Sequence, residues 1–493
     1  MGLSLYFHLQ QKEKSAISFL LLGAFLLRLL MTGLDDFLHD WDERYHALVA
    51  KNMLLQPFSP MLRAEPVLPY NYQNWTQNHI WLHKQPLFLW QMALSMRIFG
   101  VNEMALRLPS AFMGLLTVFS TYQIGKIVTT ERIAYISAFL LTFAFYQLKL
   151  TSGAHQIDHN DVVFLGYITA SIWAVLAFQQ AEKKAYSWLI LIGMLVGCAV
   201  LTKWLTGCVV YAAWGIAVLL DKEKGRQIAE YGYIAISFAL TCLVALPWQI
   251  YIAVTFPPEN TWERDYNWRH VTEVVEGHTA PVWYYLDETN YQYGAASLIL
   301  ILVGAYFFWK KSSYSWGRNL IFLSVGMVYF FFSVIAKSIG SSYVYVMAAL
   351  LYLWQGAAVE AIISRWENRF STKLFFTGIL LFFALYAAGF DRLYHRIACD
   401  KNIEERLTKE NERKTFQKLD SLLPEKQVIF NTKAEIEAMF YSHHNYYTGW
   451  LTEAQYQELK QKGYKMAYFS PENEADIPVF LKNDTEIKAV FYE

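Results

Sequence analysis

Apolar runs of roughly 20 residues recur along most of this 493-residue chain. A helix of about 20 apolar residues crosses the hydrocarbon core of a bilayer. Eleven membrane-spanning segments are therefore predicted, near residues 15–33, 104–125, 132–150, 160–179, 187–202, 205–220, 229–250, 292–309, 319–336, 343–362 and 373–390. The segments 187–202 and 205–220 are short and are separated only by Lys203 and Trp204. They predict either a tight hairpin or a partly re-entrant pair.

The basic residues of the short loops predict the orientation, because cytoplasmic loops are enriched in Lys and Arg. One side collects Lys12, Lys14, Lys126, Arg132, Lys183, Lys184, Lys222, Lys224, Arg226, Lys310, Lys311, Arg318, Arg365, Arg369 and Lys373. The short loops of the other side offer only Lys149, Lys203 and Lys337. We therefore expect a cytoplasmic N-terminus in a cytoplasmic (inner) membrane. The first apolar run is long for a signal peptide and lacks a small-residue cleavage site, so we expect a retained anchor.

Three segments fall outside the apolar runs, and an odd number of spans places all of them on the periplasmic or extracellular side. They are the first outer loop (34–103), a later loop (251–290) and a C-terminal tail (391–493). In the first loop, Asp42–Gln56 has the periodicity of an amphipathic helix lying at the membrane interface. In the tail, strands are expected at 427–431, 465–470 and 487–492, with helices between them. Two domains follow: a transmembrane domain (1–390) and a small α/β domain (391–493).

Composition agrees with a polytopic α-helical membrane protein. Hydrophobic residues make up 55% of the chain and charged residues only 17%, against about 25% charged in soluble proteins. Basic and acidic residues number 42 each, so no electrostatic argument favours a nucleic acid partner. Cys198, Cys208 and Cys242 lie inside apolar runs. No disulfide framework is therefore expected outside the membrane.

The first candidate site follows the first span, where acids are crowded among aromatic residues. It reads Asp40-Trp41-Asp42-Glu43-Arg44-Tyr45. Carboxylates in this setting could serve catalysis as well as solubility. The competing interpretation, with about even odds, is that acids favour the first turn of a helix, where they meet the positive end of its dipole.

A second candidate lies at the end of the first outer loop, where a basic pair precedes a proline: Trp81-Leu82-His83-Lys84-Gln85-Pro86. Its alternative is an interfacial anchor, because Lys, Trp and His all favour the headgroup region. A third candidate is His155-Gln156-Ile157-Asp158-His159-Asn160-Asp161, between the third and fourth spans. Ionisable groups at a membrane boundary are functional candidates, and a polar helix cap is the competitor at roughly one in three.

These outer-side groups match what sugar transfer from a lipid-linked phosphate needs. Phosphate is a good leaving group, so the reaction demands no general acid. The attacking hydroxyl needs a carboxylate base. Lysine, arginine or a divalent metal ion can stabilise the charge that develops on the phosphate. This chemistry shares the logic of inverting glycosidases, with a better leaving group in place of the acid.

The order of the motifs resembles the C-type superfamily of polyprenyl-phosphate-dependent glycosyltransferases, including bacterial relatives of protein O-mannosyltransferases and lipid A aminoarabinose transferases. The resemblance spans roughly residues 15–350. Seven stretches carry it: Asp42–Ala47, His83–Phe88, Gly100–Ser110, Asp161–Phe164, Leu201–Lys203, Gly277–Tyr285 and Ala336–Tyr343.

By this resemblance, Asp42 is the catalytic base and Glu43 supports it or binds a metal ion. The carrier phosphate would be bound by Lys84 and Lys203, with Arg269 and Lys337 as weaker candidates. The acceptor or metal side would be formed by Asp158, Asp161, His83 and His278. The implied partners are a polyprenyl-phosphate-linked sugar, membrane lipids and a lipid, glycan or protein acceptor.

Three positions depart from the family pattern. Gln85 stands where a proline is usual, and His83 stands where the aminoarabinose branch has an acid. The second departure argues against carrying over that branch's metal site and donor sugar. No proline follows Tyr343, which makes the role of Lys337 the least secure.

Two other functions remain open from the sequence. A transporter or flippase for lipid-linked sugars would share the membrane architecture, but such proteins often contain internal repeats and broken helices. We find no convincing repeat, and the ionisable residues gather at one boundary, which favours chemistry. An oligosaccharide or polymer ligase differs mainly in the size of its donor.

Overall fold

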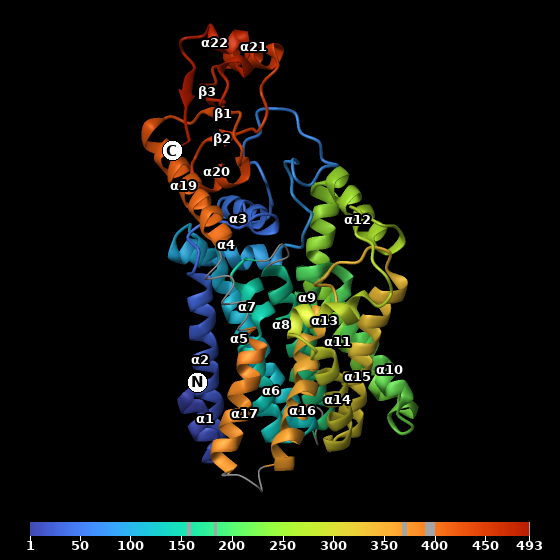
Figure 1. Ribbon diagram of the computed structural model, residues 1–493. Helices are drawn as coiled ribbons and strands as arrows, with labels where there is room; N and C mark the ends of the chain where they lie inside the picture. The colour runs from blue at the N-terminus through green and yellow to red at the C-terminus, as the bar shows by residue number, and fades with distance from the viewer. Residues whose placement is uncertain (155–158, 182–184, 367–371, 390–399, 493) are drawn as a thin grey trace. The chain divides into compact units, whose positions relative to one another are not determined.

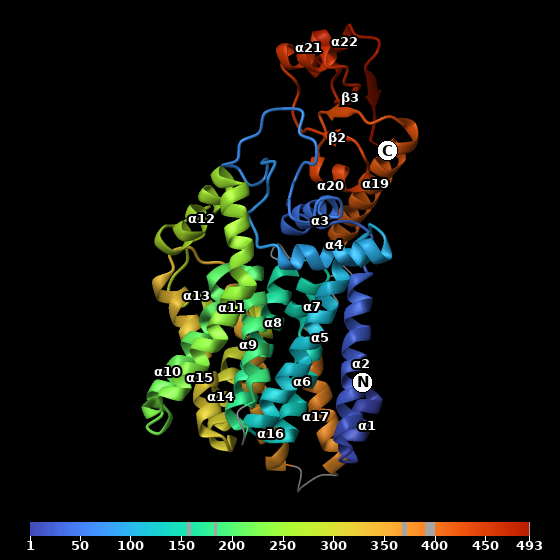
Figure 2. The ribbon, with the colours of Figure 1, turned by 180° about the vertical axis from the view of Figure 1, so that it is seen from behind.

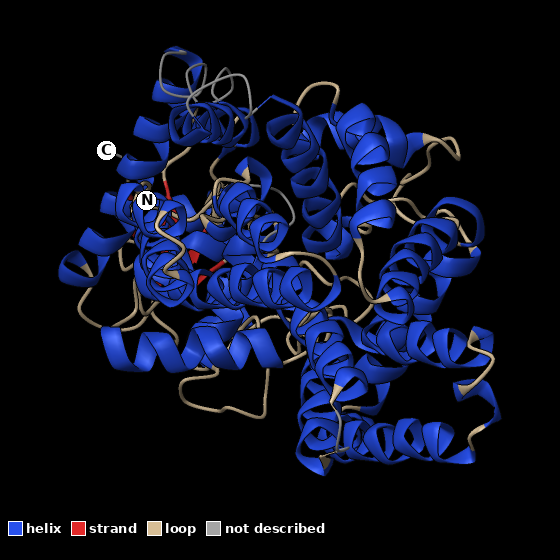
Figure 3. Cartoon of the chain, turned by 90° about the horizontal axis from the view of Figure 1, so that it is seen from below, coloured by secondary structure: helices blue, strands red, loops and turns tan. Residues whose placement is uncertain are grey.

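The computed structural model describes residues 1–154, 159–181, 185–366, 372–389 and 400–492. The chain divides into two compact units. The helical unit comprises residues 1–34, 84–88 and 107–394, and the mixed unit comprises 35–83, 89–106 and 395–493. Within the described residues, helices make up nearly all of the regular structure, and strands are few and short (Figure 3).

The helical unit is a bundle of long apolar helices, several of which run alongside one another (Figures 1 and 2). Its helices are α1 (Gly2–Leu9), α2 (Glu13–Thr32), α5 (Glu103–Val128), α6 (Glu131–Thr142), α7 (Phe145–Thr151), α8 (His159–Gln180), α9 (Tyr186–Lys203), α10 (Val209–Leu220), α11 (Ile228–Thr255), α12 (Pro257–Thr272), α13 (Tyr284–Tyr293), α14 (Ser297–Lys311), α15 (Ser315–Phe330), α16 (Ala348–Trp366) and α17 (Thr372–Ala387). Within the described residues, seven stretches are long and apolar enough to cross a membrane, or up to nine if each of two bent pairs is one span. The protein is therefore a polytopic membrane protein.

The count of eleven spans is not confirmed. The predicted segments 187–202 and 205–220 fall in one continuous candidate, Tyr186–Leu220, and the last predicted segment contains only the shorter apolar helix α17. The chain nevertheless folds back after α9. A Cβ placed on Gly207 would lie 2.7 Å from the backbone nitrogen of Val200, whereas residues seven apart on a straight helix are separated by about two turns. The turn Trp204–Cys208 therefore folds back on the end of α9, but α9 and α10 do not pack along each other, so the tight hairpin and the partly re-entrant pair both remain predictions.

Glycines allow the closest helix packing in the bundle. A Cβ added at Gly304 of α14 would lie 2.0 Å from the carbonyl oxygen of Trp354 in α16. A Cβ added at Gly356 would lie 2.0 Å from Ser137 Oγ in α6. Small residues at such crossings let helix backbones approach closely, which is how helices associate in lipid.

The mixed unit combines two helices of the first outer loop with a small parallel sheet. The loop helices are α3 (Asp42–Asn52) and α4 (Leu87–Phe99). The C-terminal part contains α19 (Asp400–Leu422), β1 (Val428–Phe430), α20 (Glu435–Tyr441), β2 (Asn445–Tyr446), α21 (Glu453–Gln461), β3 (Met466–Phe469), α22 (Val479–Lys482) and β4 (Lys488–Val490). The strands pair in the order β2-β1-β3-β4, all parallel, with Val428 opposite both Asn445 and Met466.

Helical crossovers explain the parallel pairing, because parallel neighbours need a connection that returns the chain to the same end of the sheet. Helices α20, α21 and α22 follow β1, β2 and β3 in turn. Thr452 and Gln455 form a capping box at the start of α21. The apolar side chains between sheet and helices include Val428, Phe430, Tyr456, Leu459 and Met466.

Helix α3 differs from the expected interfacial helix. It ends at Asn52, and every side chain from Tyr45 to Ala50 is buried. Helix α3 packs against α20, beside which it lies in both views (Figures 1 and 2). A face covered by another helix is not available to lipid. Helix α4 does expose apolar side chains: Leu94, Ile98 and Phe99 are each at least 60% exposed.

The Gly304 crossing gives a testable consequence. Gly304→Ala would force α14 away from α16, because the new methyl group overlaps a backbone carbonyl that cannot rotate away. We expect a loss of thermal stability of about 1–3 kcal/mol, measured by thermal unfolding in detergent. Gly326→Ala on α15 is the matched control, since no atom lies within 4 Å of its added Cβ. Equal melting temperatures for the two variants would contradict this packing.

Candidate functional site

A largely buried ion pair of the helical unit joins two residues singled out from the sequence. Lys203 Nζ donates a hydrogen bond to Asp161 Oδ1. Asp161 lies in the first turn of α8 and Lys203 ends α9. These helices follow each other in the chain and pack together, so the start of α8 meets the end of α9. The Asp161 side chain is 5% exposed and that of Lys203 is 24% exposed.

Further side chains hold this pair. Ser342 Oγ donates to Asp161 Oδ2 at 3.2 Å, and the Lys203 ammonium lies 5.6 Å from the centre of the Tyr343 ring. At the start of α8, His159 Nδ1 and Ser110 Oγ are 2.9 Å apart. The sequence did not single out Ser342, and only its position beside the Lys337 motif could have suggested it.

A second lysine of the helical unit also meets an aromatic hydroxyl. Lys149 Nζ donates to the Tyr291 hydroxyl at 3.1 Å, and lies 5.8 Å from the centre of its ring. Lys149 lies in α7 and Tyr291 in α13. Neither residue was assigned a role from the sequence. An ammonium that faces a phenol remains available to an anion in a way that one paired with a carboxylate does not.

The lysine–proline motif is held by its neighbour Gln85. Gln249 Nε2 donates to Gln85 Oε1 at 2.7 Å, and Gln85 is buried. Gln249 lies in α11. The glutamine that replaces the usual proline therefore fixes the chain directly after Lys84, which is half-buried.

The weaker phosphate candidates are Arg269 in α12 and Lys337 in the loop after α15, and backbone hydrogen bonds join these two segments. Lys337 N–H donates to Val271 O at 3.2 Å, and Ile339 N–H donates to His278 O at 3.0 Å. The side chains of Lys337 and His278 are exposed. Arg269 pairs with Glu273 one turn along α12, at 2.9 Å. This exposed pair occupies the guanidinium with a local partner.

The acidic motif of the mixed unit divides into two different environments. Glu43 is fully buried, and its Oε2 accepts the His39 N–H at 2.6 Å. That contact agrees with the interpretation of the acids as helix-start residues. Asp42, the first residue of α3, is half-exposed. Trp41 before it has φ of 65°, a conformation that is uncommon for a bulky residue.

The remaining candidates were His83, His155 and Asp158. His83 stacks on Trp75 at 4.5 Å between ring centres and meets Trp81 edge-on at 5.7 Å. His155 and Asp158 lie outside the described residues.

The predicted metal side does not form a metal cluster among the described residues. The one group of three suitable ligands found there is Asp420, His443 and His444, none of which was predicted. His444 Nδ1 accepts the Gln427 N–H at 3.2 Å. A neutral His444 therefore carries its proton on Nε2, the atom that faces Asp420 at 3.6 Å. This nitrogen has no lone pair to offer, so the group does not fit a metal ion.

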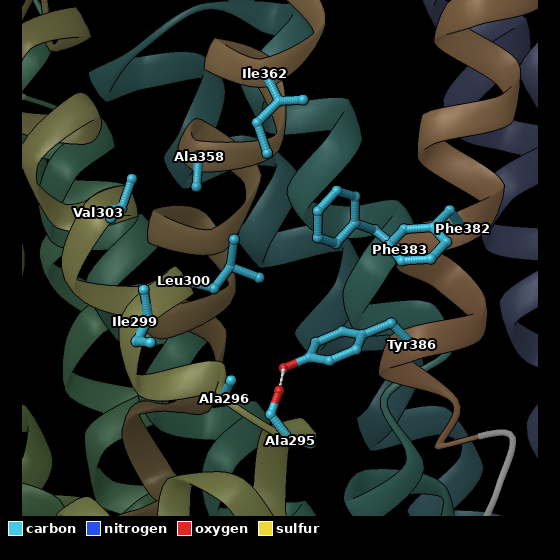
Figure 4. A pocket seen from close by; sticks show the side chains of 10 residues that line it. All are labelled: Ala295, Ala296, Ile299, Leu300, Val303, Ala358, Ile362, Phe382, Phe383 and Tyr386. Carbon is cyan, nitrogen blue, oxygen red and sulfur yellow. Dashed lines mark hydrogen bonds between the residues drawn. The ribbon is translucent and has the colours of Figure 1, made fainter.

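An apolar hollow of about 300 Å³ lies between α14, α16 and α17. Figure 4 shows Tyr386 pointing toward Ala295, to whose carbonyl oxygen its hydroxyl donates at 2.6 Å. The other lining residues are apolar and include Leu300, Val303 and Phe383. A sugar or phosphate would find no further polar partner here, which excludes the hollow as the site of chemistry.

Comparison with known proteins finds glycosyltransferases. The family described as dolichyl-phosphate-mannose-protein mannosyltransferase matches residues 83–251. ArnT from Cupriavidus metallidurans, solved with undecaprenyl phosphate bound, aligns with a TM-score of 0.65 at 14% identity, covering 93% of this chain and 86% of that one. The archaeal oligosaccharyltransferase AglB from Archaeoglobus fulgidus, with a dolichol-phosphate, aligns with a TM-score of 0.57 at 13% identity, covering 88% and 64%.

This chain has the fold of the C-type polyprenyl-phosphate-dependent glycosyltransferases. The resemblance predicted from the motifs is confirmed.

The curated relatives of this chain are named as sugar transferases. The undecaprenyl phosphate-alpha-4-amino-4-deoxy-L-arabinose arabinosyl transferase 2 of Pseudomonas fluorescens is 25% identical over 279 residues, covering 54% of this chain and 46% of the relative. A transferase of the same description from Pseudomonas aeruginosa is 25% identical over 201 residues, covering 40% and 36%. The chain thus spans about half the length, or less, of the curated relatives it matches.

The Asp161–Lys203 pair predicts strong coupling between two substitutions. Asp161→Asn leaves an unpaired half-buried ammonium, and Lys203→Met leaves an unpaired buried carboxylate. Each single variant should lose about 1–3 kcal/mol, and the double variant should lose less than the sum. Thermal unfolding of all four proteins in detergent measures the coupling. Additive losses would show that the two charges do not stabilise each other.

Proposed function

We propose that this protein is an inverting glycosyltransferase that moves a sugar from a polyprenyl-phosphate carrier to a hydroxyl acceptor at the outer face of the cytoplasmic membrane. The observation that carries the proposal is the ion pair of Asp161 and Lys203, placed at helix ends of a C-type fold. The Lys203 ammonium has three N–H donors, so it can donate to a phosphate oxygen while it keeps its hydrogen bond to Asp161.

The proposed reaction is a single displacement. The Asp42 carboxylate takes the proton of the acceptor hydroxyl as its oxygen attacks the anomeric carbon of the sugar. A new carbon–oxygen bond forms while the bond from that carbon to the phosphate oxygen breaks. The electron pair of the broken bond remains on the carrier phosphate, where Lys84 and Lys203 would stabilise it. Attack opposite to the leaving group inverts the anomeric configuration.

The donor class is supported by the relatives, two of which are named for undecaprenyl phosphate-linked aminoarabinose. The fold neighbours were solved with undecaprenyl phosphate and with a dolichol-phosphate. We extend to this chain only the shared part, a polyprenyl phosphate that carries a sugar. The acceptor is a lipid, glycan or protein hydroxyl. Under this proposal the N-terminus is cytoplasmic and residues 391–493 lie on the outer side.

An oligosaccharide ligase is the second candidate, favoured by the likeness to an oligosaccharyltransferase. It would use the same base and the same phosphate cations but a longer donor. Donor size therefore separates the two candidates, and the same assay can include both kinds of donor.

The base assignment predicts the effect of Asp42→Asn. Membranes carrying wild type or variant would be incubated with a panel of radiolabelled undecaprenyl-phosphate sugars, including one oligosaccharide. We expect a loss of about 10²-fold or more, with normal membrane insertion, because the amide cannot accept the hydroxyl proton. Asp36→Asn is the matched control, an exposed carboxylate of the same loop. Wild-type turnover by Asp42→Asn would remove Asp42 from the base role.

The phosphate assignment predicts a different kinetic effect for Lys84→Ala. Loss of one cation should raise the apparent KM for the donor lipid about tenfold, the effect of one charged hydrogen bond. Lys310→Ala, an exposed lysine at the end of α14, serves as the control. Steady-state kinetics in detergent with varied donor lipid distinguish them. Similar KM values for the two variants would exclude Lys84 as a phosphate ligand.

A further inference from the structure

The loop that leads into Asp42 is held by the C-terminal helices. Arg406 of α19 pairs with Asp35 at 2.6 Å, and the Asp35 side chain is 2% exposed. The Leu38 N–H donates to the Tyr441 hydroxyl at 2.9 Å, and this hydroxyl donates to Glu103 Oε1 at 2.6 Å. Residues more than 330 positions apart in the sequence thus hold this loop.

Four charged side chains interact around the segment that contains Asp42, and two of them, Asp40 and Arg44, lie two positions before and after it in the sequence. Asp40 accepts a hydrogen bond from Lys409 of α19. The Lys409 ammonium also lies 3.9 Å from Glu437 Oε1 of α20, and the same oxygen pairs with Arg44 Nη1 at 3.1 Å. Asp40, Lys409, Glu437 and Arg44 therefore form a continuous chain of alternating charge. We name these four residues the charge bridge.

The centre of the charge bridge is buried. The Glu437 side chain is 5% exposed, so its carboxylate depends on Arg44 and Lys409 for compensation of lost hydration. Burial lowers the pKa of Lys409, but its hydrogen bond to Asp40 and the nearby charge of Glu437 outweigh this and raise the pKa above its ordinary value. Lys409 therefore stays charged at neutral pH.

Helix α20 is itself held in place by α3. Lys51 Nζ donates to the carbonyl oxygens of Met439 and Phe440, both at 2.8 Å, and of Ser442 at 3.0 Å. These are acceptors at the C-terminal end of α20, which lack partners within the helix. Burial lowers the pKa of Lys51 to about 8, so the ammonium with its three donors still predominates at pH 7.

The backbone between the two ends of the charge bridge is strained. Trp41 has φ of 65° and ψ of −126°, outside the regions favoured by residues with a side chain. Such a conformation costs roughly 1–3 kcal/mol and persists only where its surroundings enforce it. The charge bridge ties residues 40 and 44, directly on either side of this strained segment.

We infer that Glu437, acting through Arg44 and Lys409, is a positioning residue that fixes the direction of the Asp42 carboxylate. The C-terminal residues 403–447 then serve catalysis without touching the substrate. Relaxation at Trp41 would rotate the start of α3 and move Asp42 away from the hydroxyl it is proposed to deprotonate. This inference rests on the proposed role of Asp42 as base.

The test uses the full-length protein with Glu437→Gln, which keeps the size of the side chain and removes its charge. We expect kcat to fall about 10–100-fold, while the KM for donor lipid changes less than about threefold. Glu437→Asp should recover part of kcat, because it restores the charge. Glu472→Gln, at an almost fully exposed glutamate of the same unit, is the matched control and should behave as wild type.

Hydrogen–deuterium exchange provides a readout that does not depend on activity. In Glu437→Gln, peptides covering residues 35–46 should exchange faster, while peptides from β1 and β3 should keep their protection. If the whole unit loses protection, Lys409→Gln replaces the variant, since it removes the ion pairs of Lys409 with Asp40 and Glu437 but keeps the pair of Glu437 with Arg44. In that variant, the same local loss and the same fall in kcat are expected.

The outcomes separate the two proposals. Unchanged kcat in Glu437→Gln and in Lys409→Gln would overturn the positioning role, whether or not exchange rises, and would leave Asp42 as the base. The positioning role would also be overturned if kcat stayed constant while KM rose, so that kcat/KM fell by the same factor. Full activity of Asp42→Asn would instead remove Asp42 from the base role on which this inference rests, and a wild-type protein that transfers sugar from no donor of the panel would defeat the proposed function.

Discussion

A carboxylate placed among apolar helices must find a cation or hydrogen-bond donors, because lipid and packed side chains offer it no water. Asp161 meets this requirement with Lys203 and Ser342. The contact joins the beginning of α8, the end of α9 and the loop before α16. Three separate parts of the helical unit therefore converge on one charge. The helix ends that bear these groups also favour them electrostatically, an acid in a first turn and a base in a last turn.

Ion pairs also stabilise the mixed unit, whose apolar core is small. Its sheet has only four short strands, a small apolar core for a domain of this kind. Ion pairs between the first outer loop and the C-terminal helices add to that core, among them Arg63 with Glu435 at 2.8 Å and Lys426 with Glu65 at 2.7 Å. The loop and the tail are distant in sequence and yet form one folded unit. The sequence-based boundary between a loop (34–103) and a separate tail domain (391–493) remains a prediction, but the contacts show that these two segments fold against each other.

The sequence predicts a structural feature well when the residues that determine it are close together in the chain. Apolar runs and the strand pattern of Val428–Phe430 are local, so the helices and strands fall close to their expected places. Asp161 and Lys203 could also be identified as candidate site residues from the sequence, because each is a charged residue beside an apolar run. The burial of α3 was not visible, because the same periodicity serves a membrane face and a protein face equally well. The sequence could not predict the hydrogen bonds of Gln249 with Gln85 and of Leu38 with Tyr441 either. Their partners are 164 and 403 positions apart, so no local sequence pattern indicates them.

The contrast between Asp42 and Glu43 shows why neighbouring acids need not share a function. Glu43 is buried, and its carboxylate accepts a hydrogen bond from the His39 N–H. This carboxylate therefore already stabilises the loop before α3. Asp42 is half-exposed at the first position of α3, close to the positive end of the helix dipole. A carboxylate acts as a base only if its direction is fixed before the substrate arrives, since reorientation during the reaction adds to the barrier. Exposure alone does not fix the direction of a side chain. The strained residue before it, the buried acid after it and the charge bridge around both restrict the backbone that carries it, and this combination distinguishes Asp42 from the other exposed acids of the loop.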